Sequence, residues 1–316
     1  MPLVSIKMPS YNHERYIAEA IESVLNQTVK DFELIIIDDG STDKSRDIIE
    51  DFKRKDERIK AVFHTENKGI AETFNEAMRV AKGKYMAYIS SDDIWIKDKL
   101  ERQLVVLAKN ENLIVWSDGE IINEKGVSTG ETFTHLHRPP QKKKSGNIFE
   151  ILLNGNFIFG SSFIALKKNL KDLTYCDRLK YLNDWLFYIE LAENYQFYFI
   201  EAPLAKYRIH EHNTNKDKIG YLLDAIKFKK IIINRYGNRI SRKAKSEFYF
   251  QIGENYEELR HALNARLYVL RALITYPLNL DARYYFTKRL KTRYPYLALL
   301  FKKYFNFLWH RQKSYL

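Results

Sequence analysis

The sequence contains a single cysteine, Cys176, in 316 residues. One cysteine excludes an internal disulfide framework and the usual cysteine-rich zinc sites, and it agrees with a reducing compartment. Long apolar runs are also missing, because no window approaches the roughly 18 apolar residues that a membrane-spanning helix needs. The N-terminal MPLVSIKMPSYN lacks a basic region followed by a long apolar stretch, so it does not predict a signal peptide. We therefore expect a cytoplasmic protein that is soluble or peripheral to a membrane.

Acidic residues become scarce in the last third of the chain. After residue 215 there are 22 lysines and arginines but 7 aspartates and glutamates, a net charge of +15 in a chain whose total is +12. The first 215 residues therefore carry a net charge of −3. This asymmetry predicts an anionic partner for the C-terminal region, such as a membrane surface. No nucleic-acid motif accompanies it, and positive charge by itself supports only non-specific nucleic-acid binding.

Short β-rich runs alternate with helical patterns over the first 122 residues. Strands are predicted at residues 3–8, 32–37, 59–64, 84–89 and 113–118, with apolar residues at helical spacing between them. The hydrophobic content of 45% is sufficient for a sizeable core. Together these patterns predict an α/β fold, in which helices flank both faces of a mostly parallel, Rossmann-like sheet.

The rest of the chain divides into a polar segment, a short mixed region and a helical region. Residues 123–146 are polar and include Pro139-Pro140 and three successive lysines, which predicts a mobile loop or linker. A helix is predicted at residues 183–193 and strands at 197–200 and 205–210. From residue 216 the pattern is helical, notably at 256–273 and 280–290. We therefore expect two domains, residues 1–215 and 216–316.

The stretch at residues 294–315 combines leucines, phenylalanines and a tryptophan with four basic residues, Lys302, Lys303, Arg311 and Lys313. Such a composition resembles a helix that lies in a membrane interface, where basic residues gain from an anionic surface. The alternative is that these aromatic side chains dock on the N-terminal domain or on a second subunit of a homo-oligomer.

Three polar clusters follow the first, second and fourth predicted strands. They are PSYN at residues 9–12, DDGSTD at 38–43 and SSDD at 90–93. Parallel sheets bind ligands outside the carboxyl ends of their strands, so we expect all three clusters along one rim. Each cluster taken alone is explained as well by a turn or a helix cap, because Asp, Gly and Ser are common in turns.

These residue types suit a ligand with a flat base, a ribose diol and a diphosphate. Tyr11 offers a ring face for stacking on a base, and Asp39 offers an acceptor for an imide N–H. Asp92 and Asp93 can divide ribose contact and metal coordination between them, and carboxylate oxygens suit Mg²⁺ or Mn²⁺. A tyrosine after a strand is also common in simple packing, so the case depends on the clusters occurring together.

Over roughly residues 3–213 the sequence resembles the family 2 glycosyltransferases, which have the GT-A fold. The matching motifs occur in order as PSYN at 9–12, SVLNQT at 23–28, FELIIIDDGSTD at 32–43, NKG at 67–69, AKGKYMAYISSDD at 81–93, NDW at 183–185 and YRIHEHN at 207–213. The resemblance implies a GT-A domain followed by the helical C-terminal region, and an enzyme that uses a nucleotide-sugar donor and Mn²⁺ or Mg²⁺.

Carried over to this sequence, the resemblance assigns the donor residues. Pro9 and Tyr11 line the base pocket, and Asp39 contacts a uracil-like base. Asp92 and Asp93 occupy the DXD-type position, with Asp93 expected as the first metal ligand. The family frequently has an acidic residue where this chain has Ser90, so one carboxylate is missing here.

The same resemblance assigns Asp184 as the base that takes the proton of the acceptor hydroxyl in an inverting transfer. Asn183 precedes it, where glutamate is common. Without the resemblance, Asp184 is explained as a first-turn residue that stabilises a helix dipole. His210 is expected to coordinate the metal or contact phosphate, or else to be a hydrogen-bonded structural histidine.

Asn67 and Lys68 are expected to contact the donor, or only to form a turn before Gly69. We therefore expect an inverting transfer of a hexose or N-acetylhexosamine from a UDP-sugar to a glycan or lipid-linked glycan acceptor. The expected setting is bacterial surface polysaccharide synthesis, for capsule, O-antigen or lipooligosaccharide, at the inner face of the cell membrane.

Two other functions remain open from the sequence. A nucleotidyltransferase that makes a nucleotide-sugar would share the sheet, the metal and the nucleotide. It would carry a glycine-rich basic loop for a triphosphate after the first strand, which PSYN does not supply. A non-catalytic, nucleotide-binding scaffold with a degenerate site is the other alternative, and Ser90 and Asn183 are the residues that suggest it.

Overall fold

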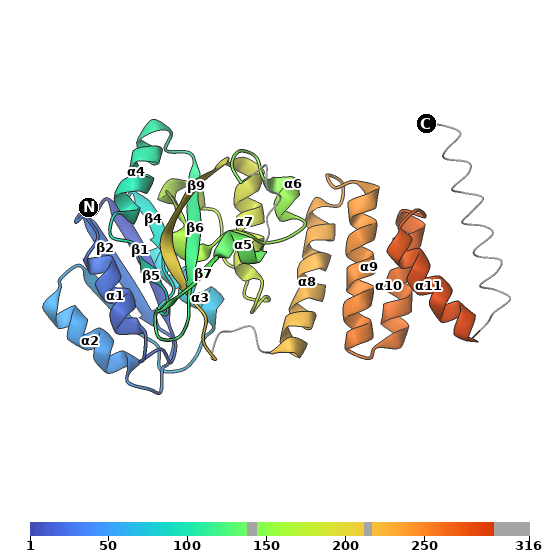
Figure 1. Ribbon diagram of the computed structural model, residues 1–316, viewed down its shortest axis with the longest axis horizontal. Coiled ribbons are helices and arrows are strands. Elements are labelled where there is room, and N and C mark those ends of the chain that lie inside the picture. The colour runs from blue at the N-terminus through green and yellow to red at the C-terminus, as the bar shows by residue number, and fades with distance from the viewer. Residues whose placement is uncertain (138–143, 212–216, 294–316) are drawn as a thin grey trace. The chain divides into compact units, whose positions relative to one another are not determined.

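The computed structural model describes residues 1–137, 144–211 and 217–293 (Figure 1). The chain divides into two compact units, Met1–Thr214 and Asn215–Leu316. The first unit contains the sheet and the helices around it, and the second contains helices α8 to α11.

Strands and helices alternate through the first half of unit one. The strands there are β1 (Val4–Ser10), β2 (Phe32–Asp38), β3 (Ile59–Phe63), β4 (Tyr85–Tyr88) and β5 (Ile94–Trp95). The helices there are α1 (Ile17–Leu25), α2 (Ser45–Lys55), α3 (Ile70–Val80) and α4 (Lys99–Lys109). The second half contains β6 (Ile114–Ile122), β7 (Ser128–Thr132), α5 (Phe133–His137), α6 (Phe149–Leu152), β8 (Ile164–Leu166), α7 (Asn183–Asn194) and β9 (Phe197–Arg208).

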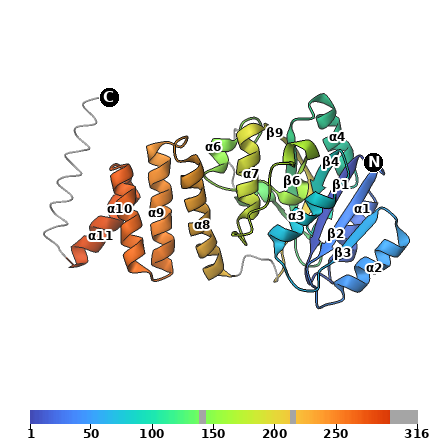
Figure 2. The ribbon, with the colours of Figure 1, turned by 180° about the vertical axis from the view of Figure 1, so that it is seen from behind.

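Within the described residues these strands form one mixed sheet in the order β3-β2-β1-β4-β8-β6-β9-β5, with β7 paired to β6. The strands β3, β2, β1 and β4 are parallel to one another, as are β6 and β9, whereas β8 is antiparallel to β4 and to β6. Helices lie on both faces of the sheet (Figures 1 and 2). The predicted α/β class with a mostly parallel sheet is confirmed.

The interior of the sheet explains why the strand sequences are so apolar. Every residue of β1 and β2 is buried, as expected for strands covered on both faces. One buried charged residue of these strands is Lys7, whose Nζ lies 4.3 Å from the ring centre of Phe74 and donates to Tyr175 Oη at 2.8 Å. Burial lowers the pKa of Lys7 well below its ordinary value. Ring faces and one hydroxyl therefore replace the water that a lysine usually needs.

Part of the predicted loop at residues 123–146 is regular structure, so that prediction was wrong for its first half. β7 pairs antiparallel with β6 through a turn in which Asn123 Oδ1 accepts the amides of Lys125 and Val127. β7 is exposed, and an exposed edge strand has a polar sequence that pattern analysis reads as a loop. Residues 138–143 of that segment lie outside the described residues.

The two strands predicted at 197–200 and 205–210 are one continuous strand, β9. Its pairing with β6 shifts register on either side of Asp118, so the chain bends without ending the strand. The irregular spacing of apolar residues in this region comes from that shift.

The second unit is helical, as expected. Its helices are α8 (Lys218–Tyr236), α9 (Arg242–Glu258), α10 (Ala262–Thr275) and α11 (Leu280–Arg293), and α8, α9 and α10 lie side by side in both views (Figures 1 and 2). The helical segment predicted at 256–273 is interrupted, because Arg260 has a φ of 61° between α9 and α10. The predicted interfacial helix at 294–315 lies outside the described residues.

Gly253 determines how closely α9 and α10 approach. A Cβ on Gly253 would lie 2.9 Å from Val269 Cγ2 and 3.1 Å from the carbonyl oxygen of Ala265. Next to Gly253, α10 therefore carries the short side chains of Ala265 and Val269. Among the described residues, no helix of either unit is both long and apolar enough to cross a membrane.

Candidate active site

Three loops converge at the carboxyl edge of the sheet. Because β1, β2 and β4 are adjacent and parallel, the loops that follow them meet at this edge. The amide of Asn12 donates to Ser41 Oγ at 2.9 Å, and the amide of Thr42 donates to Asn12 Oδ1 at 2.8 Å. His13 Nδ1 lies 2.7 Å from Ser91 Oγ in the third loop. The rim that the sequence predicts is therefore a hydrogen-bonded structure.

Pro9 and Tyr11 occupy different environments at this rim. Pro9 is buried inside β1, where it pairs with Ile37. Tyr11 lies just beyond the strand, and 45% of its surface is exposed. A ring face of Tyr11 is therefore available for stacking, whereas Pro9 is buried within the strand.

Asp39 organises the loop that carries Asn67 and Lys68. Its Oδ1 accepts the backbone amide of Lys68 at 2.8 Å, and its Oδ2 accepts that of Gly69 at 2.8 Å. The side chains of Asn67 and Lys68 are exposed above this anchored backbone. Asp39 therefore holds the loop in place, and with His64 also on Oδ1, one acceptor site of Oδ2 is left for a ligand N–H.

His64 connects Asp39 to helix α3. Its Nδ1 lies 2.7 Å from Asp39 Oδ1 and its Nε2 lies 2.7 Å from Glu76 Oε2, so both ring nitrogens face carboxylates. Burial alone would lower the pKa of His64, but the hydrogen bonds to Asp39 and Glu76 raise it above its ordinary value. A protonated imidazole donates to both carboxylates, which fixes the orientation of Asp39.

His13, Asp92 and His210 form a cluster that could hold a metal ion. Each offers one ligand atom, and these atoms lie within 4.8 Å of one another. Asp92 Oδ2 is 3.0 Å from His210 Nε2, and the Tyr16 ring lies against His210 with a centroid separation of 4.6 Å. Tyr16 Oη is buried without a hydrogen-bond partner among the described residues. Two imidazoles and a carboxylate agree with a cation site.

The charge state of Asp92 suits a cation. Burial opposes its ionisation, but the hydrogen bond from His210, the charge of His13 and the hydroxyl of Ser90 together lower the pKa of Asp92 below its ordinary value. The carboxylate is therefore ionised at neutral pH, as metal ligation requires.

Asp93 lies behind this cluster and is almost fully buried. Its Oδ2 accepts a hydrogen bond from Ser161 Oγ, and its Oδ1 accepts the amide of Arg208 at 3.0 Å. Burial, and then the charge of Asp92, raise the pKa of Asp93 well above its ordinary value. Asp93 therefore attaches β9 to the loop after β4, and it is absent from the cluster of possible metal ligands.

Arg208 completes this attachment. Its Nε donates to the carbonyl oxygen of Asp92 at 2.9 Å and its Nη2 to Glu19 Oε2 at 2.5 Å. Its side chain is 2% exposed. These contacts hold His210, two residues further along the chain, next to Asp92.

Asp184 is the second residue of helix α7 and is partly buried. Asn156 Nδ2 donates to its Oδ2 at 3.3 Å, and the amide of Trp185 donates to its Oδ1 at 2.7 Å. Burial raises the pKa of Asp184 from 3.8 to about 6, although these hydrogen bonds oppose the shift. A carboxylate with this pKa is ionised at pH 7 and basic enough to take a proton from a hydroxyl in a transition state.

Tyr88, the last residue of β4, is influenced both by the carboxylates of the loop after β4 and by Asp184. Burial raises its pKa well above the ordinary value, and the negative charges of Asp93, Asp92 and Asp184 add to the effect. The carboxylates after β4 and the one at the start of α7 therefore both lie near enough to Tyr88 to raise its pKa.

Comparison with known families identifies this arrangement. Residues 5–174 match the model for glycosyl transferase family 2. The chain belongs to this family. A relative in Methanocaldococcus jannaschii, described as an uncharacterised glycosyltransferase, is 34% identical over 222 residues, which cover 69% of this chain and 74% of the relative.

Two relatives of this family 2 glycosyltransferase have more specific names. The teichuronic acid biosynthesis glycosyltransferase TuaG of Bacillus subtilis, a putative assignment by its name, is 50% identical over 103 residues. This match covers 33% of the chain and 41% of TuaG. WfgD of Escherichia coli, named as a glucosyltransferase from UDP-Glc to GlcNAc-diphosphoundecaprenol, is 42% identical over 125 residues, 40% of the chain and 49% of WfgD.

Solved structures confirm the GT-A fold of the glycosyltransferase. Staphylococcus aureus TarS 1–349 in complex with UDP-GlcNAc superposes with a TM-score of 0.62 at 20% identity, covering 84% of this chain and 80% of TarS. The mannosyltransferase PcManGT of Pyrobaculum calidifontis, in complex with GDP-Man and Mn²⁺, gives a TM-score of 0.57 at 15% identity, covering 96% of this chain and 85% of that protein.

Sequence reasoning on this glycosyltransferase missed His13, His64 and Tyr16. His13 follows PSYN directly, in a cluster already assigned to the rim, and His64 is the last residue of a predicted strand. Their positions after strand ends were the available signal. Their partners, Ser91 for His13 and Glu76 for His64, are distant in sequence and become adjacent only in the fold.

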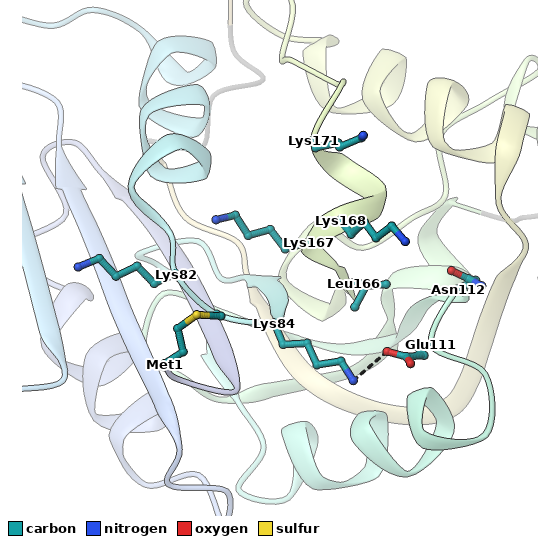
Figure 3. Close-up of a pocket in the computed structure, with 10 residues that line it drawn as sticks. Met1, Lys82, Lys84, Glu111, Asn112, Leu166, Lys167, Lys168 and Lys171 are labelled. Atoms are coloured by element: carbon teal, nitrogen blue, oxygen red, sulfur yellow. Dashed lines mark ion pairs between the residues drawn. The ribbon is translucent and has the colours of Figure 1, made fainter.

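A separate groove of about 620 Å³ lies at the opposite edge of the sheet, where β1 and β4 begin (Figure 3). Lysines dominate its lining, with one carboxylate, and the charged residues are Lys82, Lys84, Glu111, Lys167, Lys168 and Lys171. Lys84 and Glu111 form an ion pair at 2.8 Å. The seven residues of β1 separate the groove from the rim by roughly 20 Å, so it is not part of the candidate active site.

Proposed function

We propose that this family 2 glycosyltransferase is an inverting, metal-dependent enzyme that transfers a hexose or N-acetylhexosamine from a UDP-sugar to a glycan or lipid-linked glycan acceptor. The proposed setting is bacterial surface polysaccharide synthesis at the cytoplasmic face of the cell membrane. The observation that carries the proposal is the cluster of His13, Asp92 and His210 on the same rim as Tyr11 and Asp39.

The donor nucleotide would lie along the loops after β1, β2 and β3. Tyr11 would stack on the base, and Asp39, held by His64, would accept the imide N–H of uracil. The exposed Asn67 and Lys68 side chains would reach the ribose or the diphosphate from the loop that Asp39 anchors. A uridine donor is also supported by UDP-GlcNAc in the related TarS structure and by UDP-Glc in the name of WfgD.

The metal ligands we propose are Asp92, His210 and His13. A bound divalent cation would neutralise charge that develops on the departing diphosphate. Mixed imidazole and carboxylate ligands suit Mn²⁺ better than Mg²⁺, which prefers oxygen ligands alone. The earlier expectation that Asp93 is the first metal ligand stays a prediction, and its hydrogen bonds to Ser161 and Arg208 favour Asp92 in that role.

The transfer we propose is a single displacement. Asp184 accepts the proton of the acceptor hydroxyl while that oxygen bonds to the anomeric carbon, and the bond from that carbon to the diphosphate oxygen breaks on the opposite face. The nucleoside diphosphate leaves with the bonding electrons, and the anomeric configuration inverts. The pKa of about 6 leaves Asp184 ionised before the reaction. No nucleophilic residue is needed, because no covalent intermediate forms.

A lipid-linked acceptor is supported by the name of WfgD, whose acceptor contains a diphosphoundecaprenol. The net charge of +15 after residue 215 supports a position at an anionic membrane surface. A homo-oligomer formed by the C-terminal unit is the alternative proposal for the same charge distribution.

The experiment is calorimetric titration of UDP, GDP and their sugars with and without Mn²⁺, on the wild type and on Asp92→Asn. We expect Mn²⁺-dependent binding of a uridine nucleotide that the variant loses. The matched control is Asp184→Asn, which should bind donor as the wild type does but not transfer sugar. Absence of nucleotide binding in the wild type would refute the enzymatic proposal and favour the scaffold alternative.

A further inference from the structure

Helix α10 in the second unit is apolar on two opposite faces. The face that packs on α9 consists of Ala265, Val269, Ala272 and Leu273, all buried. The opposite face carries Leu263, Leu267, Leu270 and Ile274, which are 80%, 44%, 39% and 68% exposed. These four residues recur at intervals of four, three and four, so they form one stripe along the helix.

The exposed stripe departs from the pattern expected for a helix on the surface of a soluble protein. Such a helix turns its large apolar side chains toward the core and its charged ones outward. Here one face is buried against α9, and three leucines and one isoleucine face outward as well. An outward face that is also apolar is expected where that face meets lipid or another protein.

The charges beside the stripe identify the surface that it fits. Arg266 and Arg271 are the charged residues of α10, both are exposed, and the helix contains no aspartate or glutamate. The chain after residue 215 carries a net charge of +15. Apolar residues flanked by arginine, in a strongly basic unit, are typical of helices that lie in the interface of an anionic membrane.

We propose that this stripe, Leu263, Leu267, Leu270 and Ile274 with Arg266 and Arg271, is the surface by which the protein binds anionic lipid. The helix would lie parallel to the membrane, with its leucines among the upper acyl chains and its arginines at the phosphates. The inference rests on the proposed function only for the location of the acceptor, and it is tested without acceptor or donor.

The test is co-sedimentation of the full chain with vesicles of phosphatidylcholine alone and of phosphatidylcholine mixed with phosphatidylglycerol. We expect binding to the mixed vesicles. The variant Leu263→Ser/Leu267→Ser should bind at least about tenfold more weakly, because each exposed leucine that enters the interface contributes a large share of the apolar area.

Charge is tested with a matched pair of variants. Arg266→Gln/Arg271→Gln should reduce binding to the mixed vesicles about tenfold, because both arginines lie at the proposed interface and each loses its attraction to the anionic lipid. The control Lys227→Gln/Lys243→Gln removes the same charge from α8 and α9, and it should bind nearly as the wild type does.

Equal vesicle binding by the wild type and the leucine variant would overturn the proposal, as would failure of the wild type to bind. Light scattering tests whether the stripe instead joins two copies of the chain. If the wild type is an oligomer, the leucine variant is a monomer and neither binds vesicles, the stripe is a contact between copies of the chain. Mn²⁺-dependent hydrolysis of the donor should be unchanged in every variant. Absence of donor hydrolysis in the wild type would contradict the proposed function and leave the result of the vesicle assay unaffected.

Discussion

Replacement of Asp184 by asparagine separates a catalytic base from a helix-dipole residue, because the two roles predict opposite changes in stability. Asparagine can still accept the amide of Trp185 and pair with Asn156, so the local geometry is retained. Activity should fall by about 10²- to 10⁴-fold through loss of the general base.

The stability change follows from the shift of the pKa. Burial raises the pKa of Asp184 from 3.8 to about 6, and each unit corresponds to 1.36 kcal/mol. Ionisation of Asp184 therefore lowers the free energy of unfolding by up to roughly 3 kcal/mol, and solvent that reaches this partly buried group makes the effect smaller. Asp184→Asn removes that cost, so we expect the free energy of unfolding to rise by about 2 kcal/mol at pH 7.

The sign depends on pH in a defined window. The folded pKa lies above the unfolded one, so the penalty is absent below about pH 4, grows between pH 4 and 6, and is complete above pH 6. Urea denaturation of wild type and variant across pH 3–8 measures it. If Asp184 only stabilised the dipole of α7, the variant would instead lose roughly 0.3–1 kcal/mol at pH 7. A destabilised variant that keeps its transfer rate would refute the assignment of the base.

Three further predictions concern the rim. Asp92→Asn should abolish Mn²⁺-dependent donor binding, whereas Asp93→Asn should retain it, because burial already favours the neutral form of Asp93. Calorimetry measures both variants, and if Asp93→Asn lost binding while Asp92→Asn kept it, Asp93 would be the metal ligand. His64→Gln should raise the KM for the donor about tenfold with little change in kcat, because it weakens the charge-assisted bond that orients Asp39, and an effect on kcat alone would contradict this. Gly40→Ala should lower the free energy of unfolding by about 2 kcal/mol or more, because its φ is 77° and a Cβ would lie 2.8 Å from the Glu66 carbonyl carbon. The control Gly130→Ala has a similar φ with nothing within 4 Å, and an equal loss would rule out the clash.

Prediction from the sequence succeeded where local patterns are strong. The strands at β1 and β2 are long buried runs, and polar clusters mark their ends, so the sheet and its rim could be derived. It failed where tertiary contacts override the local pattern. β7 looked like a loop because its side chains face water, and α9 and α10 looked like one helix because a single left-handed residue, Arg260, separates them.

The site divides in the same way. The sequence by itself determined which chemistry is present: aromatic and acidic residues after strand ends, and Asp184 at the start of a helix. Only the tertiary structure decided which carboxylate faces the rim, since Asp92 and Asp93 are adjacent in sequence but turn to opposite partners, His210 and Ser161. The two residues lie in the turn between β4 and β5, so the role of each carboxylate depends on which distant segment packs against it.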